Sequence, residues 1–164
     1  MAGDLIAIGI RTPLADPKAA LDKVQALARA RGGWGQLLDA DAVLGRDHLV
    51  SALDHARRAF DQGRNATESI AMEFLLYASG ERQISKAIRA AGVKPGRVFV
   101  VILSGGLSAE DLLAATGWEW DDSLLEPTVQ RLRGAGFSDD EIESAGDRPF
   151  DLILERVARV DLLK

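Results

Sequence analysis

The chain has 164 residues, a hydrophobic content of 47% and a formal net charge of −5 at pH 7. These values suit a single domain over residues 1–164, because a chain of about 150 residues buries about 70% of its unfolded surface. The sequence has no cysteine, which excludes disulfides, zinc–thiolate sites, iron–sulfur clusters and thiol nucleophiles and favours a reducing, cytoplasmic location. The apolar run Leu5–Ile10 is far shorter than the ~20 residues of a membrane span, so no membrane contact is expected.

The N-terminal part of the chain predicts alternating strands and helices. Residues 4–11 predict a strand, and residues 17–31 predict a helix that Asp16 caps and a pair of glycines ends. Residues 36–44 predict a short strand followed by a turn. Apolar residues at three- and four-residue steps predict an amphipathic helix over residues 47–62.

Two further helices and a buried strand are predicted in the middle of the chain. Residues 67–79 form a strongly apolar helical run, and residues 83–91 form another helix. Gly80 lies between them, where it can supply the left-handed turn that ends the first helix. The continuous apolar run within residues 97–104 predicts a central strand that is buried on both faces.

The C-terminal third is predicted to be helical. Ser108 and Ser138 precede acidic residues in the pattern of a helix N-cap, and Pro127 is placed to open another helix. Residues 151–163 predict a last amphipathic helix. Together these elements predict an α/β single domain with a small mixed or antiparallel central sheet of about three or four strands, surrounded by about seven helices.

Basic residues concentrate in the middle of this acidic chain. Residues 57–97 contain eight basic and four acidic side chains, so this segment carries +4 and the remainder −9. Within it, Arg82, Gln83 and Lys86 lie around a helix start, where backbone N–H groups lack partners and attract anions. Such a local cluster favours a small, focused anion contact over a groove that wraps a long duplex. Solvated helix faces remain the alternative interpretation of these charges.

Evidence for catalysis or metal binding is weak. His48 and His55 are the only histidines, and seven residues on one helix separate them by ~10.5 Å of rise, too far for one metal ion. We therefore predict half-buried histidines on a helix face, with no metal site and no cofactor. The carboxylate pairs Asp39 with Asp41, and Asp121 with its neighbour, are predicted to be surface turns. A hydrolase or transferase that uses one of these pairs is a distant alternative, which loss of activity in Asp39→Asn or Asp121→Asn would support.

Several segments of the chain resemble a known family. The most specific is the run Tyr77-Ala78-Ser79-Gly80-Glu81-Arg82-Gln83-Ile84, preceded by Arg64-Asn65. Weaker matches are His48-Leu49 with Arg57-Arg58-Ala59-Phe60, Asp122-Ser123-Leu124-Leu125, and Leu154-Glu155-Arg156-Val157-Ala158. With these residues the chain resembles the small tRNA-recruiting accessory subunit of the KEOPS complex, the PRPK-binding protein family, over most of its length.

The resemblance implies a non-catalytic role in tRNA modification. KEOPS transfers a threonylcarbamoyl group to the adenosine beside the anticodon, and a separate subunit carries out the transfer. The accessory subunit is expected to bind the KEOPS kinase/ATPase subunit and, through it, the threonylcarbamoyl-transferase subunit, and to grip the single-stranded 3′ CCA end of the tRNA. By position, the residues implied for that grip are Arg64, Asn65, Gly80, Arg82, Gln83, Ile84 and Lys86, with Arg57 and Arg89 as possible further contacts.

The chemistry of these residues suits a single-stranded RNA end. Arg64, Arg82 and Lys86 can bind phosphates, while Asn65 and Gln83 can hydrogen-bond base edges. The sequence does not determine whether the two segments that carry these residues meet in the fold. The alternative hypothesis is a protein-only adaptor or activator of the partner kinase that makes no RNA contact.

Overall fold

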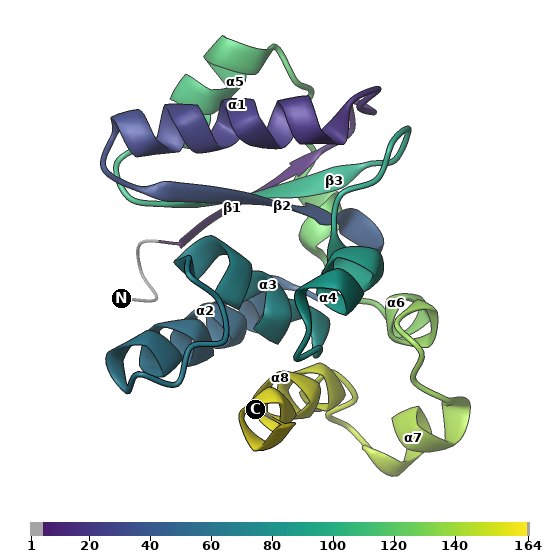
Figure 1. Cartoon of the computed structure of the whole chain (residues 1–164). Helices are drawn as coiled ribbons and strands as arrows, with labels where there is room; N and C mark the ends of the chain where they lie inside the picture. The colour runs from purple at the N-terminus through teal and green to yellow at the C-terminus, as the bar shows by residue number, and fades with distance from the viewer. Residues whose placement is uncertain (1–4, 164) are drawn as a thin grey trace.

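The computed structural model describes residues 5–163, so Asp4 of the predicted first strand lies outside the described residues. Figure 1 shows the arrangement of the elements. In chain order they are β1 (Leu5–Ile10), α1 (Pro17–Ala30), β2 (Trp34–Asp39), the 3-10 helix η2 (Ala40–Ala42), α2 (Arg46–Asp61), α3 (Ile70–Ser79), α4 (Ile84–Ala91), β3 (Phe99–Ser104), α5 (Ala109–Thr116), the 3-10 helix η3 (Asp122–Leu125), α6 (Val129–Gly134), α7 (Asp139–Ser144) and α8 (Asp151–Leu163).

The strands described within residues 5–163 form one antiparallel sheet in the order β1-β3-β2. Since both outer strands run antiparallel to β3, they are parallel to each other, and α1 crosses one face of the sheet to join them (Figure 1). Leu5 of β1 and Trp34 of β2 both pair with Ser104 of β3. Every residue of β3 is buried, which confirms the predicted central strand, although it begins at Phe99 and not at Arg97.

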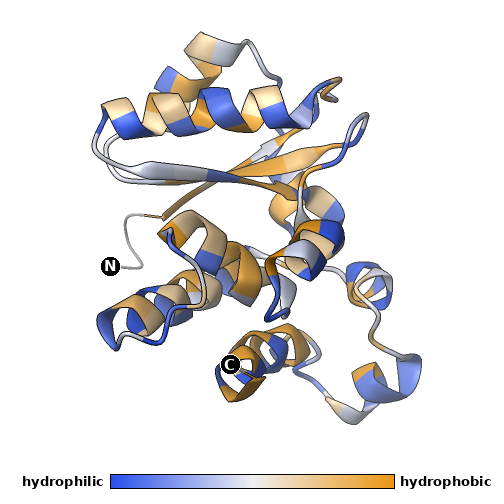
Figure 2. Ribbon diagram, viewed as in Figure 1, coloured by the Kyte–Doolittle hydropathy of each residue, from blue (hydrophilic) through white to orange (hydrophobic). Residues whose placement is uncertain are grey.

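Alternate strand residues point to opposite faces of the sheet, and helices cover the apolar residues of both faces. On one face, Val101 and Leu103 share a buried cluster with Val24 of α1. On the other, Val100 and Ile102 share a cluster with α2, α3 and α4. In Figure 2, β1, β3 and α3 are among the most hydrophobic segments, which matches their position inside the molecule. The predicted α/β class is therefore confirmed.

The C-terminal helix α8 joins this core on its outer side. It packs against α2 and α3 through Val157 and Val160, as the predicted amphipathic pattern required. A small separate cluster connects α8 to α6 and to the loop before α2; it consists of Leu44, Leu132, Phe137 and Ile153. The C-terminal helices thus extend the side of the molecule that carries α2 to α4.

Several predicted helix ends are confirmed by their caps. The Asp16 carboxylate accepts a hydrogen bond from the Ala19 N–H at 3.1 Å, which fixes the start of α1. Ser108 caps α5, and Ser138 forms a complete capping box with Glu141 at the start of α7. These interactions span only three residues, which is why the sequence reveals them.

The helix predicted over residues 67–79 begins only at Ile70. Ser69 is its N-cap, and the Thr67 N–H and hydroxyl donate to the buried carboxylate of Glu73 at 2.9 and 2.8 Å. Because Thr67 donates these hydrogen bonds to Glu73 in the first turn of α3, the backbone before Ser69 turns away and does not continue the helix.

Two other predicted boundaries are also wrong. Pro127 does not open a helix, because Thr128 is the N-cap of α6 and its hydroxyl accepts a hydrogen bond from the Arg131 N–H at 3.1 Å. The strand predicted over residues 36–44 begins already at Trp34 and ends at Asp39. There the Asp39 carboxylate accepts a hydrogen bond from the Asp41 N–H, and η2 begins.

His48 is fully buried and not half-buried as predicted. Its Nδ1 accepts a hydrogen bond from the Leu44 N–H at 3.1 Å, so Nε2 carries the proton and donates to the Ala78 carbonyl at 2.8 Å. Burial lowers the pKa of His48 to about 4. The neutral imidazole therefore joins the loop before α2 to the end of α3.

Asp39 is buried, which corrects the predicted surface turn. Its carboxylate forms ion pairs with Lys94 at 3.4 Å and Arg97 at 3.2 Å, and Arg97 also pairs with Asp41. Asp39 thus holds the loop before β3 against the end of β2. Within residues 5–163, no group of three or more metal-ligating side chains gathers, and no helix is long and apolar enough to cross a membrane.

Candidate nucleic-acid interface

The corner between α3 and α4 is built around Gly80. This residue has a φ of +75°, in the left-handed region, and ends α3 as predicted. The N–H of Glu81 donates back to the Leu76 carbonyl at 3.1 Å and closes the last turn. The chain then reverses at once, so Arg82 and Gln83 lie directly beside the end of α3.

Helix α4 rests on the protein through only one narrow face. Ala87 and Ala91, one helical turn apart, are its buried residues, and the other side chains of the helix are exposed. Gln83 is its N-cap, but the Gln83 side chain makes no capping hydrogen bond. The predicted residues Lys86 and Ile84 are therefore accessible, Ile84 with 42% of its surface exposed.

The last turn of α8 contacts both Arg64 and Arg82. Arg82 Nη1 donates to the Leu163 carbonyl at 3.1 Å, and Arg64 Nη2 lies 3.8 Å from Asp161 Oδ1. Arg64 also donates to the Gln62 side chain at 2.9 Å. Residues 161 and 163 lie on the last turn of α8, so both arginines contact the same end of this helix. Each of the two predicted segments thus contacts the end of α8.

The remaining predicted residues are more dispersed. Asn65 is exposed, and its amide donates to the Thr67 carbonyl at 2.8 Å within the loop before α3. Arg89 is exposed on the last turn of α4. Arg57 is half-buried on α2, and its Nη2 donates to Ser104 Oγ at 3.2 Å at the end of β3. Arg57 is therefore directed at the sheet.

Below the two arginines, a buried polar contact fixes the end of α8. Asp161 accepts hydrogen bonds from the Tyr77 hydroxyl and from His55 Nδ1, the latter at 2.7 Å. Partial burial disfavours the Asp161 carboxylate, yet these hydrogen bonds and the neighbouring charges bring its pKa below the usual range. Burial, together with the bond to Asp161, raises the pKa of Tyr77. Tyr77 is fully buried, so its ring packs in the core and is not open to stack on a base.

Gly80 has a second structural role that the sequence did not indicate. A Cβ added at this position would lie 2.4 Å from Cγ and 2.7 Å from Cδ of Arg156 on α8. The glycine therefore leaves room for the aliphatic part of that arginine. Although Arg156 belongs to one of the weaker matching segments, no local pattern predicts its contact with a residue so far away in sequence.

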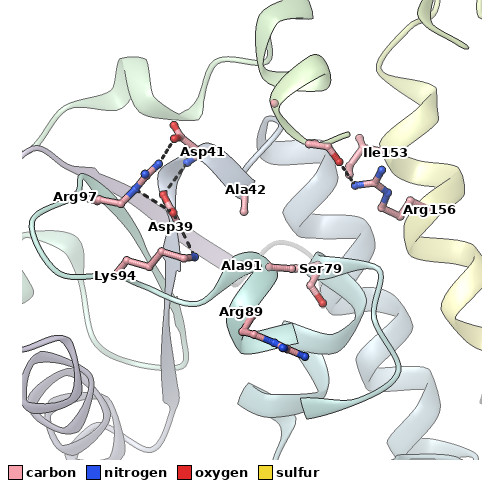
Figure 3. Close-up of a pocket in the computed structure, with 14 residues that line it drawn as sticks. Asp39, Asp41, Ala42, Ser79, Arg89, Ala91, Lys94, Arg97, Ile153 and Arg156 are labelled. Carbon is pink, nitrogen blue, oxygen red and sulfur yellow. Dashed lines mark hydrogen bonds and ion pairs between the residues drawn. The ribbon is translucent and has the colours of Figure 1, made fainter. Parts of the chain in front are cut away.

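Arg156 lines a cleft between the α3–α4 corner and the C-terminal helices. The cleft has a volume of about 420 Å³. Figure 3 shows its lining, with Asp39, Lys94 and Arg97 on one side and Arg156 on the other. A neighbouring cavity of about 360 Å³ shares Ser79, Ala90, Ala135 and Arg156 with it and continues toward the end of α8. Sequence reasoning missed this cleft.

Comparisons with known proteins identify the family of the chain. Residues 18–121 match the family described as Kinase binding protein CGI-121. The regulatory protein Cgi121 of Methanocaldococcus jannaschii is 32% identical over 131 residues, which span 79% of this chain and 84% of that protein. The chain therefore belongs to the kinase binding protein CGI-121 family, and the family predicted from the sequence is confirmed.

Proposed function

We propose that this protein is a non-catalytic accessory subunit of a KEOPS-type tRNA threonylcarbamoyladenosine-modification complex. In this role it binds the kinase/ATPase subunit, and through it the transferase subunit, and recruits tRNA by its single-stranded 3′ CCA end. The names of the family and of the similar regulatory protein support the kinase contact. The observation that carries the RNA contact is the approach of Arg64 and Arg82 to the same turn of α8.

The chemistry of the surface suits a short single strand. Arg64, Arg82 and Lys86 are exposed cations, and the adjacent start of α4 presents backbone N–H groups that attract phosphate. The exposed amides of Asn65 and Gln83 can hydrogen-bond base edges, which are accessible in an unpaired CCA tail. One cluster thus combines phosphate and base contacts, as proteins that bind single strands require.

The contacts that Arg64 and Arg82 make in the free protein can be exchanged for RNA phosphates. The ion pair of Arg64 is long, at 3.8 Å, and its side chain is 46% exposed. Exposed ion pairs of this kind stabilise a protein by about 0–1 kcal/mol. RNA phosphates that accept charge-assisted hydrogen bonds from these arginines therefore replace such contacts at little cost in free energy.

The proposal is tested with two transcripts of one tRNA, one intact and one lacking its 3′ CCA. We expect binding of the intact transcript, and loss of most of that affinity on removal of the tail. Equal affinity for both transcripts, or no binding of either, would exclude the CCA grip and leave the kinase contact as the remaining function.

A protein-only adaptor is the second candidate function, and one observation favours it. Large apolar side chains are exposed on α4 and at the end of α8, a composition that suits a protein partner. They are Ile84, Ile88, Leu162 and Leu163. Under this hypothesis the kinase subunit is bound with full affinity and the tRNA transcripts are not bound. Titration of the purified kinase subunit alongside the two transcripts separates the candidates.

A further inference from the structure

The cleft beside Arg156 has the features of a prepared anion site. Two contacts hold the guanidinium of Arg156 in place: Nη1 donates to the Ala135 carbonyl at 2.9 Å, and the group lies 3.9 Å above the centre of the Phe137 ring. The missing side chain of Gly80 leaves space for its aliphatic part. Since its position is fixed before any ligand arrives, little conformational entropy is lost on binding.

The positive charge of Arg156 is not matched by an ion pair. Among residues 5–163, no carboxylate lies within 4.0 Å of its guanidinium, and Glu81 and Glu141 act on it only at longer range. The group is half-buried, and this burial lowers the pKa of Arg156. A half-buried cation without a close counter-ion is stabilised when an anion binds beside it.

The other charged residues of the cleft add to the positive potential. The two cavities together are lined by five cations and three carboxylates, although the whole chain is acidic. Two of these carboxylates, Asp39 and Asp41, are already paired with Lys94 and Arg97 on the far wall. Within the described part of the chain, Arg89 and Arg159 have neither a side-chain hydrogen bond nor an ion pair.

The size and walls of the cleft limit the ligand. Ala78, Ala90, Ala91 and Ile153 form small apolar walls, and the volume of about 420 Å³ falls in the range of small-molecule pockets. Such a site accommodates a nucleoside-sized body next to the guanidinium. Planar guanidinium groups bind phosphate through two parallel hydrogen bonds, which favours phosphate over a halide or a single carboxylate oxygen.

We propose that the cleft between α4 and α8 binds a phosphate group of a nucleotide, with Arg156 as the fixed contact and Arg89 and Arg159 as mobile ones. The phosphate belongs either to a free mononucleotide or to a nucleotide of a bound RNA strand, since both present the same chemistry. Neither Arg64 nor Arg82 lines this cleft or its neighbouring cavity.

The test is a calorimetric titration of the full chain with AMP and, separately, with adenosine at low ionic strength. We expect AMP to bind and adenosine, which lacks the phosphate, to bind at least about tenfold more weakly. Arg89→Gln and Arg159→Gln should each weaken AMP binding by about tenfold. Arg89 and Arg159 are exposed, so these two variants should fold. Arg156→Lys keeps the charge but loses the planar guanidinium, so it reports on the fixed contact.

Arg58→Gln is the matched control, because Arg58 is an exposed arginine on α2 outside the cleft. It should leave AMP affinity unchanged. Equal binding of AMP and adenosine, absence of AMP binding, or an equal loss in Arg58→Gln would overturn the proposal. Displacement of AMP by tRNA would assign the phosphate to RNA, and simultaneous binding would assign it to a free nucleotide. The AMP titration contains no tRNA, so its failure would leave the proposed CCA contact untouched.

Discussion

At the scale of single residues, the same position can serve the fold and the proposed site. Gly80 provides the left-handed end of α3, and it also leaves room for Arg156. Arg82 begins the proposed RNA surface, yet its guanidinium hydrogen-bonds the end of α8. The sequence identified both residues, but it did not indicate their contacts with α8.

Arg82→Glu should lower tRNA affinity by at least about tenfold, because it replaces a phosphate-binding cation by a repelling carboxylate. The fold should persist, since Arg82 is exposed and its hydrogen bond to the Leu163 carbonyl is a surface contact. Filter binding at constant salt measures the effect, with Arg58→Glu as the charge-matched control. Wild-type affinity in Arg82→Glu would show that the assignment of this surface is wrong.

Gly80→Ala should destabilise the protein by about 2–3 kcal/mol, since left-handed backbone strain adds to a clash with Arg156. Gly117→Ala is a matched control: Gly117 ends α5 with a φ of +70°, and nothing lies within 4 Å of its added Cβ. It should cost only about 1 kcal/mol. Chemical denaturation measures both, and equal losses would refute the role of the Arg156 contact.

At the scale of elements, buried polar groups form hydrogen bonds between helices whose contact the hydrophobic pattern of the sequence does not predict. His48 connects the start of α2 with the end of α3, and Asp161 connects α8 with Tyr77 of α3 and His55 of α2. Apolar packing brings these helices together, and each hydrogen bond then selects one relative position. The contacts of Arg64 and Arg82 with the end of α8 depend on that position.

The burial of His48 predicts acid sensitivity. Its pKa is about 4 in the folded protein and about 6.5 when unfolded, so between these values the unfolded chain binds more protons. Its contribution to stability is present above pH 6.5 and is lost as the pH falls toward 4, by up to about 1.4 kcal/mol per pH unit. Denaturation curves from pH 7 to 4.5 should show this slope, and His48→Gln should reduce it. An unchanged slope in the variant would assign the acid sensitivity to other groups.

Asp161→Asn should loosen α8 and lower the stability of the protein at neutral pH. The folded pKa of Asp161 is depressed, so its contribution is present above the ordinary carboxyl pKa and is lost as the pH falls through the lower folded value. Hydrogen exchange should report faster opening of α8, with smaller changes in β3, because local contacts govern local opening. Uniform acceleration across both elements would contradict this assignment.

At the scale of the whole molecule, charge is distributed unevenly. The segment over residues 57–97 carries +4 on a chain of net charge −5, and its cations face two different regions. Arg64 and Arg82 both contact the end of α8, whereas Arg89 lines the cleft beside Arg156. An acidic body with one basic side disfavours long nucleic acids and permits a focused contact.

The affinity for tRNA should therefore depend only weakly on salt. Contacts from Arg64, Arg82 and Lys86 to about three phosphates of a single strand predict a slope of log K against log[salt] of about −2. Titrations at several salt concentrations measure this slope. A slope several times steeper would indicate a large duplex footprint and would contradict the proposed CCA contact.

The sequence alone determined the features that depend on neighbours a few residues apart. Helical periodicity identified α2 and α8, a continuous apolar run identified β3, and single side chains such as Asp16 identified helix starts. The run from Tyr77 to Ile84 identified the family. Boundaries failed at Ile70, because Glu73 binds the preceding backbone in a way that helical periodicity does not reveal.

Only the tertiary structure decided which distant residues meet. It brought both Arg64 and Arg82 to the end of α8, placed Arg156 against Gly80, and buried both His48 and Asp39. These contacts depend on how helices pack on the sheet, since packing sets distances between residues that are tens of positions apart. Local propensity and periodicity carry no information on that packing, so the candidate residues were predictable while their arrangement was not.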